Sequence, residues 1–421
     1  MSAADLVVVG AGAAGLWLAG SAAEAGLQVL VLEKTVRTGT KVLASGGTRC
    51  NLTTTLGPNE AAALFGRKAE RFLGPAFSAL PPLEVRQRFA EWGVPSVEAP
   101  LEKVFPASGR AKDVRDALER RAREAGAWLR LGSGVREVRP EGDGWLLQLD
   151  GESIAADRVA LASGGRSYPR TGTTGEGYGW LEHLGLRLTP TSPALVPLTS
   201  PASWVHELSG IAWQDGEARL VDGRGKVLLR RSRPILFTHT GISGPGAMDL
   251  SGPVGAAIGT EGQADHALLV DLAPERARDE TRALLVEGAA TSGAPRLSRV
   301  LPERIPRRLL AALARQAELP GPDPRVAHLQ KAHRHSLVEA LHGLHVPLNG
   351  TRGFDLAEVT RGGLDLREVD PRSMRVNAHR GLFVVGELLD LDGPIGGLNF
   401  QAAFACAEVA ARALAKECGR A

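Results

Sequence analysis

The residues with the clearest chemistry lie near the start of the chain, where the motif GAGAAG occupies positions 10–15. It follows an apolar run at 6–9 and precedes a helix of small residues that should end near Ala25. The first glycine permits a tight turn, the second lets the backbone approach a pyrophosphate, and the third lets the helix pack closely on the sheet. The next apolar run ends in Glu33, whose carboxylate can accept hydrogen bonds from a ribose diol. Together these features predict a dinucleotide site rather than a glycine-rich structural turn.

The following segment, GTKVLASGGTRCN at positions 39–51, helps to distinguish between the dinucleotides that such a turn can hold. FAD and NAD both bind the unit of strand, turn and helix. The segment combines glycines with Lys41, Ser45, Arg49 and Asn51. Such a loop lets a backbone lie against an extended cofactor while polar groups meet its edge. This composition favours FAD; an ordinary surface loop with basic residues is the alternative.

Two later segments also have residues that suit contact with a dinucleotide. The strand expected at 158–163 ends in small residues, which can meet the adenosine and pyrophosphate without a side-chain clash; a structural turn is the alternative. The strand expected near 381–387 ends in Gly386 and Glu387, and the loop at 393–400 leads through two glycines into a helix. Reduction of a flavin places negative charge near N1 and the C2 carbonyl, which backbone N–H groups at that helix start would stabilise.

The predicted cofactor contacts therefore come from distant stretches of the chain. They are Gly10, Gly12, Ala14, Gly15, Glu33, Lys34, Lys41, Ser45, Gly46, Gly47, Arg49, Cys50, Asn51, Val135, Ala162, Ser163, Gly164, Gly386, Glu387, Gly396, Gly397, Leu398, Asn399 and Phe400.

Candidates for acid and base chemistry are fewer. His239 follows a β-type run and, together with Tyr168 and Arg170, is a candidate catalytic residue; a structural role is the alternative for each. Cys50 lies in the expected cofactor loop, but a lone cysteine is usually a packing residue. Five histidines between 328 and 345 fall on one predicted helix and its end, with 328, 335 and 342 on one face. Because they lack carboxylate or thiolate partners at ligand spacing, we expect an exposed helix face and no metal.

These residues must be positioned by an α/β fold. We expect a split Rossmann-type FAD-binding domain made from residues 1–190 and 346–421. Residues 191–272, with short β-type runs and frequent Gly and Pro, predict an inserted β-rich, barrel-like domain. Residues 273–345, rich in Ala, Leu, Arg and Glu, predict a small helical subdomain of about three helices.

Composition narrows the possible partners and compartments. Fifty Lys and Arg against 47 Asp and Glu leave a formal charge of +3, and we read this balance as too weak and too even for a phosphate-tracking surface. We therefore expect a small-molecule substrate and no nucleic acid; the sequence leaves the oligomeric state open. The uncharged run at 6–23 is interrupted by glycines and has no basic leader, so no membrane segment is expected. Three widely spaced cysteines fit a reducing, cytoplasmic setting.

The sequence resembles the BaiN and aminoacetone-oxidase type of FAD-dependent oxidoreductases over nearly its whole length. The resemblance rests on VVVGAGAAGLWLA, GTKVLASGGTRCNLT, LASGGRSYPRTGTTGEGYGW, FTHTGISGPGAMDLSG and the run from EVTRGGLDLREVDPRSM through GLFVVGELLDLDGPIGGLNFQAAFACA. It implies the split FAD-binding fold described above. The chain departs from the family pattern at Thr48, where a third glycine is usual, and at Leu398, where tyrosine is usual.

The resemblance implies an enzyme in which a small organic substrate or NAD(P)H passes a hydride to flavin N5. NAD(P)H would act as a transient electron donor, because the sequence shows no second GxGxxG unit. Family members imply either oxidation of small amines or reduction of a conjugated carbon–carbon double bond. A flavin-dependent RNA-modifying enzyme and a flavin-holding binding or sensor protein without turnover are the alternatives.

Overall fold

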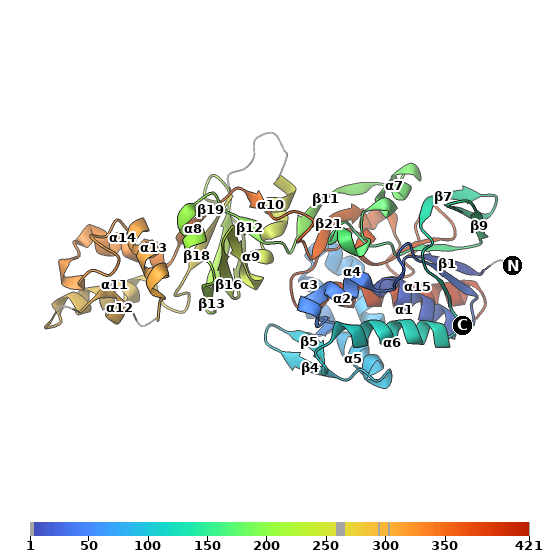
Figure 1. Cartoon of the computed structure of the whole chain (residues 1–421), viewed down its shortest axis with the longest axis horizontal. Coiled ribbons are helices and arrows are strands. Elements are labelled where there is room, and N and C mark those ends of the chain that lie inside the picture. Colours follow the sequence, from blue (N-terminus) through green and yellow to red (C-terminus); the bar gives the residue numbers. More distant parts are fainter. Residues whose placement is uncertain (1–3, 258–265, 294, 302–303, 421) are drawn as a thin grey trace. The chain divides into compact units, whose positions relative to one another are not determined.

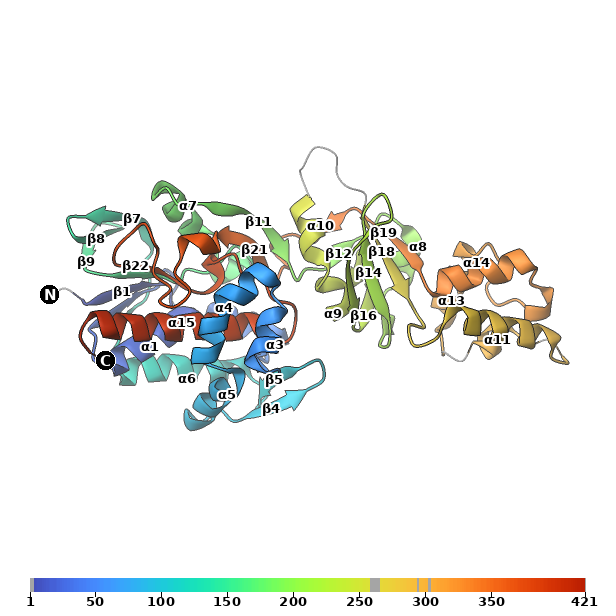
Figure 2. The ribbon, with the colours of Figure 1, turned by 180° about the vertical axis from the view of Figure 1, so that it is seen from behind.

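The computed structural model describes residues 4–257, 266–293, 295–301 and 304–420 (Figures 1 and 2). The chain divides into two compact units. Unit 1 consists of Met1–Pro193 and Phe354–Ala421, and unit 2 consists of Ala194–Gly353. Unit 2 is therefore inserted between two segments of chain that fold together.

Unit 1 is organised around a five-stranded parallel sheet with the order β22-β10-β1-β2-β6. Its strands are β1 (Leu6–Val9), β2 (Val29–Leu32), β6 (Trp128–Arg130), β10 (Val159–Leu161) and β22 (Leu382–Val384). Most of them read as continuous buried apolar runs because helices and other strands cover both faces of a parallel sheet. The C-terminal strand β22 pairs with β10, so both ends of the chain build one sheet. The predicted α/β fold with a split Rossmann-type domain is confirmed.

Helices α1 (Ala13–Glu24), α6 (Ala111–Glu124) and α15 (Leu398–Glu417) lie close together beside this sheet (Figure 2). The other helices of unit 1 are α2 (Thr40–Thr48), α3 (Pro58–Ala63), α4 (Arg67–Ala79), α5 (Pro82–Glu91) and α7 (Glu176–His183). The smaller sheets contain β3 (Thr53–Thr54), β5 (Lys103–Pro106) and β4 (Ser96–Ala99); β7 (Val135–Glu141), β8 (Gly144–Leu149) and β9 (Ser153–Ala156); and β11 (Leu188–Ala194) with β21 (Val359–Leu364). The uncharged run at 6–23 forms β1 and most of α1, and none of the described helices is long and apolar enough to cross a bilayer.

Unit 2 contains a β-rich part and a helical part, as predicted (Figure 1). One antiparallel sheet has the order β13-β16-β17-β12-β20 and the other β15-β14-β18-β19. The strands are β12 (Leu198–Thr199), β13 (Ala212–Trp213), β14 (Glu217–Val221), β15 (Val227–Ser232), β16 (Ile235–Thr238), β17 (Gly241–Ser243), β18 (His266–Asp271), β19 (Leu344–Leu348) and β20 (Gly350–Thr351). The helices are α8 (Ser203–Glu207), α9 (Pro245–Met248), α10 (Ser251–Ala257), α11 (Arg278–Ala290), α12 (Leu297–Val300), α13 (Arg307–Gln316) and α14 (Lys331–Leu341).

The histidines of the helical part do not share the single helix face that the seven-residue spacing predicted. His328 ends a separate short helix, η2 (Val326–His328), whereas His335 is exposed on α14. His342, just after α14, is buried between the Asp271 carboxylate, 3.1 Å from its Nδ1, and the Thr281 hydroxyl, 2.9 Å from its Nε2. This buried chain of polar groups joins β18, α11 and the end of α14. No group of three His, Cys, Asp or Glu within the described ranges could hold a metal ion.

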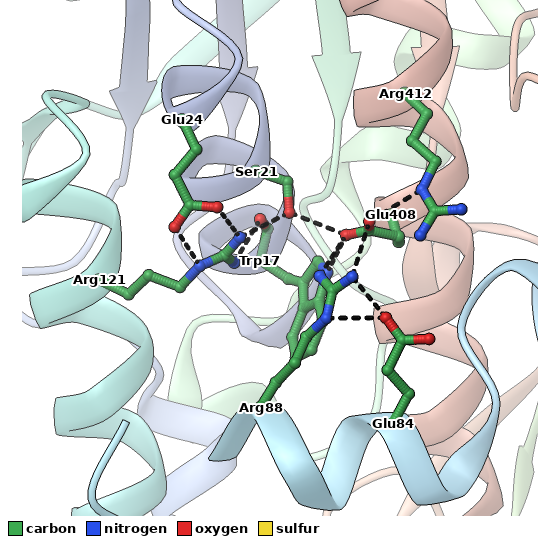
Figure 3. A network of polar contacts seen from close by, with 8 residues as sticks. All are labelled: Trp17, Ser21, Glu24, Glu84, Arg88, Arg121, Glu408 and Arg412. Atoms are coloured by element: carbon green, nitrogen blue, oxygen red, sulfur yellow. Dashed lines mark hydrogen bonds and ion pairs between the residues drawn. The ribbon is translucent and has the colours of Figure 1, made fainter. Parts of the chain in front are cut away.

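A buried carboxylate links α15 to α1 and α5 (Figure 3). Glu408 of α15 accepts hydrogen bonds from Trp17 Nε1 and Ser21 Oγ, each at 2.9 Å, and from Arg88 Nη1 at 3.0 Å. Arg412, one turn further along α15, donates to its other oxygen at 3.0 Å. Only 7% of the Glu408 side chain is exposed, so these donors replace the water that a carboxylate requires. The sequence offered one signal for this contact, an acid in the middle of a helix of mostly small and apolar residues.

A second buried ion extends the network to α6. Arg121 of α6 donates to the Glu24 carboxylate at 2.7 and 2.8 Å, to Ser21 Oγ at 2.8 Å, and packs over the Trp92 ring at 4.6 Å. Ser21 thus donates to Glu408 while accepting from Arg121 (Figure 3). The network therefore holds together helices that come from both ends of the chain.

Burial alone would raise the pKa of Glu408, but the hydrogen bonds from Trp17 and Arg88 and the charge of Arg88 lower this pKa to about 2. A carboxylate whose pKa is lower in the folded state stabilises the protein above its unfolded pKa of about 4.3, and this contribution is lost as the pH falls toward the folded value.

We predict that Glu408→Gln lowers the free energy of unfolding by about 1–3 kcal/mol at neutral pH, because it removes the buried carboxylate that accepts from Trp17 and Arg88 and leaves the half-buried Arg88 guanidinium with Glu84 as its ion-pair partner. Urea denaturation measures this loss. The matched control is Glu91→Gln, an exposed carboxylate on α5 that should change stability by less than about 0.5 kcal/mol. The difference between wild type and Glu408→Gln should shrink from about pH 5 to pH 2. Equal midpoints for both variants would contradict the role of Glu408.

Candidate functional site

The glycine turn before α1 adopts the close packing that its sequence predicted. Gly10 has φ +106°, and a Cβ atom there would lie 2.6 Å from the carbonyl oxygen of Ala162, just after the neighbouring strand β10. A Cβ atom at Gly15 would lie 1.9 Å from the carbonyl oxygen of Gly10. Both positions therefore require glycine for the protein's own packing. Gly12 differs, because no heavy atom of the described structure lies within 4 Å of a Cβ built there.

Glu33 lies beside this turn with its carboxylate fixed in place. Its Oε2 accepts a hydrogen bond from the Ala11 N–H at 2.8 Å, and its Oε1 accepts from the Thr35 N–H and hydroxyl, both at 2.8 Å. A carboxylate has about four acceptor positions, so one position remains for a further donor such as one hydroxyl of a diol. The neighbouring Lys34 instead forms an ion pair with Glu176 at 2.6 Å, at the start of α7.

The C-terminal segment reaches the same turn. A Cβ atom at Gly386, where φ is +74°, would lie 3.0 Å from the Ala14 Cβ atom in the first turn of α1. The adjacent Glu387 forms a 2.5 Å ion pair with Lys41 and accepts from the Thr360 N–H at 2.7 Å. Residues that are more than 340 positions apart in sequence, such as Lys41 and Glu387, thus meet directly.

The segment at 39–51 is more ordered than the loop we expected. Residues from Thr40 onward form the helix α2, which is interrupted at Ser45, Gly46 and Gly47. Both glycines are left-handed, with φ of +54° and +64°, and Thr48 follows at φ +68°. A threonine in this region costs about 1–3 kcal/mol of backbone strain, which the glycine usual in the family would avoid. Ser45 Oγ donates to the Val42 carbonyl at 2.7 Å and stabilises the interruption.

Cys50 is fully buried at the end of this segment, and burial raises the pKa of its thiol to about 12. A thiol with such a pKa remains protonated and unreactive at neutral pH. The burial therefore favours a packing role for Cys50 over a redox or covalent one.

Three polar residues that we expected at the cofactor use their side chains to shape loops. The Arg49 guanidinium lies over the Phe105 ring at 4.4 Å, and Asn51 Oδ1 accepts from the Val104 N–H at 3.0 Å. Asn399 closes the loop before α15 by accepting from the Gly393 N–H at 2.9 Å and donating to its carbonyl at 2.8 Å. These loops are thus held by side chains, while backbone amides remain the groups available at the helix start.

The start of α15 is packed closely against β3. Gly397 has φ +81°, and a Cβ atom there would lie 1.9 Å from the Thr53 carbonyl oxygen, whereas Gly396 has more space around it. Leu398 is buried, and Phe400 stacks on Phe404 with ring centroids 5.8 Å apart. The departure from tyrosine at Leu398 therefore falls on a core position.

A buried polar atom near the glycine turn has no hydrogen-bond partner in the described part of the chain. Ser163 Oγ, just after β10, is buried and has no hydrogen-bond partner among the described residues. Gly164 next to it is left-handed at φ +77°, and Val135 is buried at the start of β7. A buried hydroxyl without a partner is costly, so its presence beside the glycine turn fits a group that binds there.

The three candidate catalytic residues lie in different surroundings. Tyr168 is half-buried at φ +53°, and burial together with the charge of Glu358 raises its pKa. Arg170 is exposed in the following turn. His239 belongs to unit 2, where it is exposed between β16 and β17. The described contacts leave all three as candidates.

A titratable residue that sequence reasoning overlooked lies between the two C-terminal loops. Burial raises the pKa of Asp392 to about 6, against the opposing charge of Arg361 at 3.6 Å and with Asp390 adding to the rise. Asp392 follows Glu387 by five positions and precedes the glycines at 396 and 397. The block LLDLDGPIGG contained the signal, since an acid between two glycine loops of a cofactor site is unusual.

The residues fit FAD. The turn has an open position at Gly12 beside the free amides of α1, a fixed acid at Glu33, and the hydroxyl of Ser163 without a partner. A parallel sheet with this turn at its carboxyl edge is the arrangement that holds dinucleotides. The fold and site define a FAD-dependent oxidoreductase.

The chain belongs to a known family, since residues 4–413 match the HI0933-like protein Rossmann domain. It is 30% identical over 419 residues to the ribosomal RNA dihydrouridine synthase of Escherichia coli, covering 96% of this chain and 97% of that protein. It is 29% identical to the 3-dehydro-bile acid delta(4,6)-reductase of Clostridium scindens, covering 97% and 98%. The fold resembles the 3-ketosteroid delta1-dehydrogenase of Sterolibacterium denitrificans at 14% identity, with a TM-score of 0.56 over 99% of this chain and 100% of that one.

We predict that Gly12→Ala leaves folding intact but reduces FAD retention severely. The backbone at Gly12, with φ −80° and ψ −167°, is accessible to alanine, and the added methyl group meets only the space assigned to the pyrophosphate. FAD content is measured as the absorbance released on denaturation, and folding by the thermal midpoint of the apoprotein.

The control is Gly74→Ala, where a Cβ atom on α4 also meets no atom of the described structure within 4 Å and where FAD content should be unchanged. Full FAD retention by Gly12→Ala would contradict the assigned position of the cofactor.

Proposed function

We propose that this protein reduces a carbon–carbon double bond conjugated with a carbonyl group, with NAD(P)H as the electron donor. The observation that supports it most is the nearly full-length likeness to two enzymes whose names describe related bond changes. Dihydrouridine is uridine without its C5–C6 double bond, which is conjugated with the C4 carbonyl. A delta(4,6)-reductase of a 3-dehydro bile acid removes ring double bonds conjugated with a 3-keto group. Between the two directions implied by the resemblance, this shared chemistry favours reduction over amine oxidation.

The substrate that we favour is a uracil base in RNA. The Escherichia coli relative matches this chain from end to end, so the likeness includes both units rather than the cofactor domain alone. A steroid-like enone is the second candidate, supported by the Clostridium scindens relative over a similar share of both chains. This proposal of RNA differs from our expectation of no nucleic acid, which was based on the small formal charge of the chain.

When bound and reduced by NAD(P)H, FAD would supply the hydride for one carbon of the double bond, and a proton would complete the reduction at the other carbon. The chain's own residues have separate tasks in this scheme. The amides at the start of α15 stabilise negative charge on the cofactor ring, and Glu33 with the α1 amides binds and orients its distant half. Lys41 and Glu387 form an ion pair at 2.5 Å, so neither leaves an unpaired charge beside the proposed cofactor site.

Asp392 is our candidate for the group that holds the proton. Its pKa near 6 leaves a protonated fraction at neutral pH, whereas an ordinary aspartate would be ionised. Arg361 of β21 and Asp390 of the same loop have opposing effects on this pKa, and Lys68 of α4 lies 3.6 Å from Asp390. The proton-holding form is therefore the form that burial favours.

The proposed function predicts two half-reactions that can be separated under anaerobic conditions. Flavin absorbance should bleach on mixing with NADPH or NADH, and it should return when uracil-containing RNA is added. Mass spectrometry of the RNA digest should then detect dihydrouridine. Flavin that bleaches but is reoxidised only by a steroid enone would favour the second candidate, and flavin that bleaches with neither donor would contradict a NAD(P)H-dependent reductase.

We predict that Asp392→Asn slows the substrate half-reaction by about 10²-fold or more, because general acid catalysis contributes roughly that factor. In the wild type this rate should fall as the pH rises through about 6, and the variant should lose that dependence. Bleaching by NADPH should be unchanged.

The control is Asp355→Asn, an exposed carboxylate of unit 1, which should keep the wild-type profile. An Asp392→Asn profile identical to that of the control would remove Asp392 from the mechanism.

A further inference from the structure

The small total charge of the chain conceals a strongly basic stretch in unit 2. Residues 296–335, here called the basic segment, contain nine Lys and Arg against three Asp and Glu, a formal charge of +6. The remaining residues contain 41 Lys and Arg against 44 Asp and Glu, a formal charge of −3. The charges are therefore segregated rather than evenly spread, and the reading of an even distribution was wrong.

The helical packing of unit 2 turns these cations toward solvent. On α13 the apolar side chains Leu309, Leu310 and Leu313 are buried, so Arg307, Arg308 and Arg315 lie on the exposed side. The five arginines between 296 and 308 are all exposed. These five residues are Arg296, Arg299, Arg304, Arg307 and Arg308.

Part of this charge remains uncompensated. Arg308 donates to the carbonyl oxygens of Glu207 and Ser209, and Arg296 donates to that of Asp323, so their positions are fixed by backbone contacts. The side chains of Arg299, Arg304 and Arg307 have no hydrogen bond or ion pair to another residue within the described ranges. Exposed guanidinium groups without carboxylate partners are available to phosphate.

The composition of the basic segment fits a nucleic acid better than a membrane surface. Eight of its nine cations are arginine, whose planar fork binds phosphate bidentately and stacks on bases. A membrane-surface helix also needs large exposed apolar side chains, and none of the exposed large hydrophobic residues of the described structure falls within 296–335. The segment contains no Phe, Tyr or Trp, so backbone phosphate contacts should dominate.

We propose that the basic segment is the surface on which this protein holds the phosphate backbone of an RNA. The choice of RNA rests on the proposed function, whereas the surface itself rests on the charge and exposure of these residues. Phosphate neutralisation releases counterions, so binding should weaken steeply with salt, by about 0.7–0.9 in the logarithmic slope for each phosphate contact.

The test uses the full-length FAD-loaded protein and a fluorescently labelled hairpin RNA with a uridine-rich loop. Fluorescence anisotropy measures Kd at several salt concentrations for the wild type and for Arg299→Ala/Arg304→Ala/Arg307→Ala. We expect the triple variant to bind roughly tenfold or more weakly at ~0.15 M salt, with a logarithmic slope smaller by about two. Its FAD content and its bleaching by NADPH should equal those of the wild type.

Two further variants separate local charge from general charge and from folding. Arg71→Ala/Arg372→Ala/Arg380→Ala removes three exposed arginines of unit 1 and should keep the wild-type slope. Replacing the three arginines of the basic segment by lysine should restore the slope, because lysine keeps the charge.

The outcomes separate the surface from the activity. Equal RNA binding by both alanine variants, with dihydrouridine still formed by the wild type, would overturn the surface and leave the proposed function standing. RNA binding that depends on the basic segment without any dihydrouridine would support the surface and contradict the activity. Binding to phosphatidylserine vesicles in preference to RNA would overturn RNA as the partner.

Discussion

A buried negative charge on the last helix is the constraint on which the split domain depends. Glu408 requires hydrogen-bond donors because it cannot reach water, and it obtains them from Trp17 and Ser21 near the start of the chain and from Arg88 on α5. Two chain segments separated by the whole of unit 2 must therefore come together before this charge is satisfied. The helices α1 and α15 also pack against each other, and the carboxylate adds specificity to this packing, since a shifted helix would leave an ion without partners.

The same pairing explains why the candidate cofactor site is closely packed around backbone groups. Once α1 and the C-terminal loops are fixed, Gly386 lies against Ala14, and Gly397 lies against the Thr53 carbonyl with no room for a side chain. The polar side chains nearby hold loops in shape, as Asn399 does for Gly393. A dinucleotide can then be recognised by amides and helix ends, whose positions are set by the fold and need no rotamer ordering on binding.

Sequence patterns predicted those structural elements that are determined by residues close together in the chain. The strands at 6–9 and 29–32, the turn between them and the inserted β-rich and helical parts follow from hydrophobic period and glycine placement. Trp17 and Arg88, which donate to Glu408, lie more than 300 positions away from it, so no local pattern could identify them. The left-handed Thr48 was also beyond reach, because a threonine adopts that conformation only when its surroundings impose it. The basic segment could have been recognised from the sequence, but the net charge of the whole chain conceals it because the remaining residues are slightly acidic.

The division into two units has a consequence for how substrates differ within the family. Hydride transfer to a conjugated double bond needs the same cofactor and the same charge stabilisation whether the bond lies in a uracil or a steroid ring. In our proposal those requirements are met by unit 1, where the glycine turn and the C-terminal loops meet. A polyanionic substrate also requires a large phosphate-binding surface, whereas a steroid does not. The basic segment, with its formal charge of +6, belongs to unit 2, where most of its arginines are exposed and the core beneath them is apolar. Substrate choice can therefore change through the inserted unit while the redox chemistry of unit 1 is preserved.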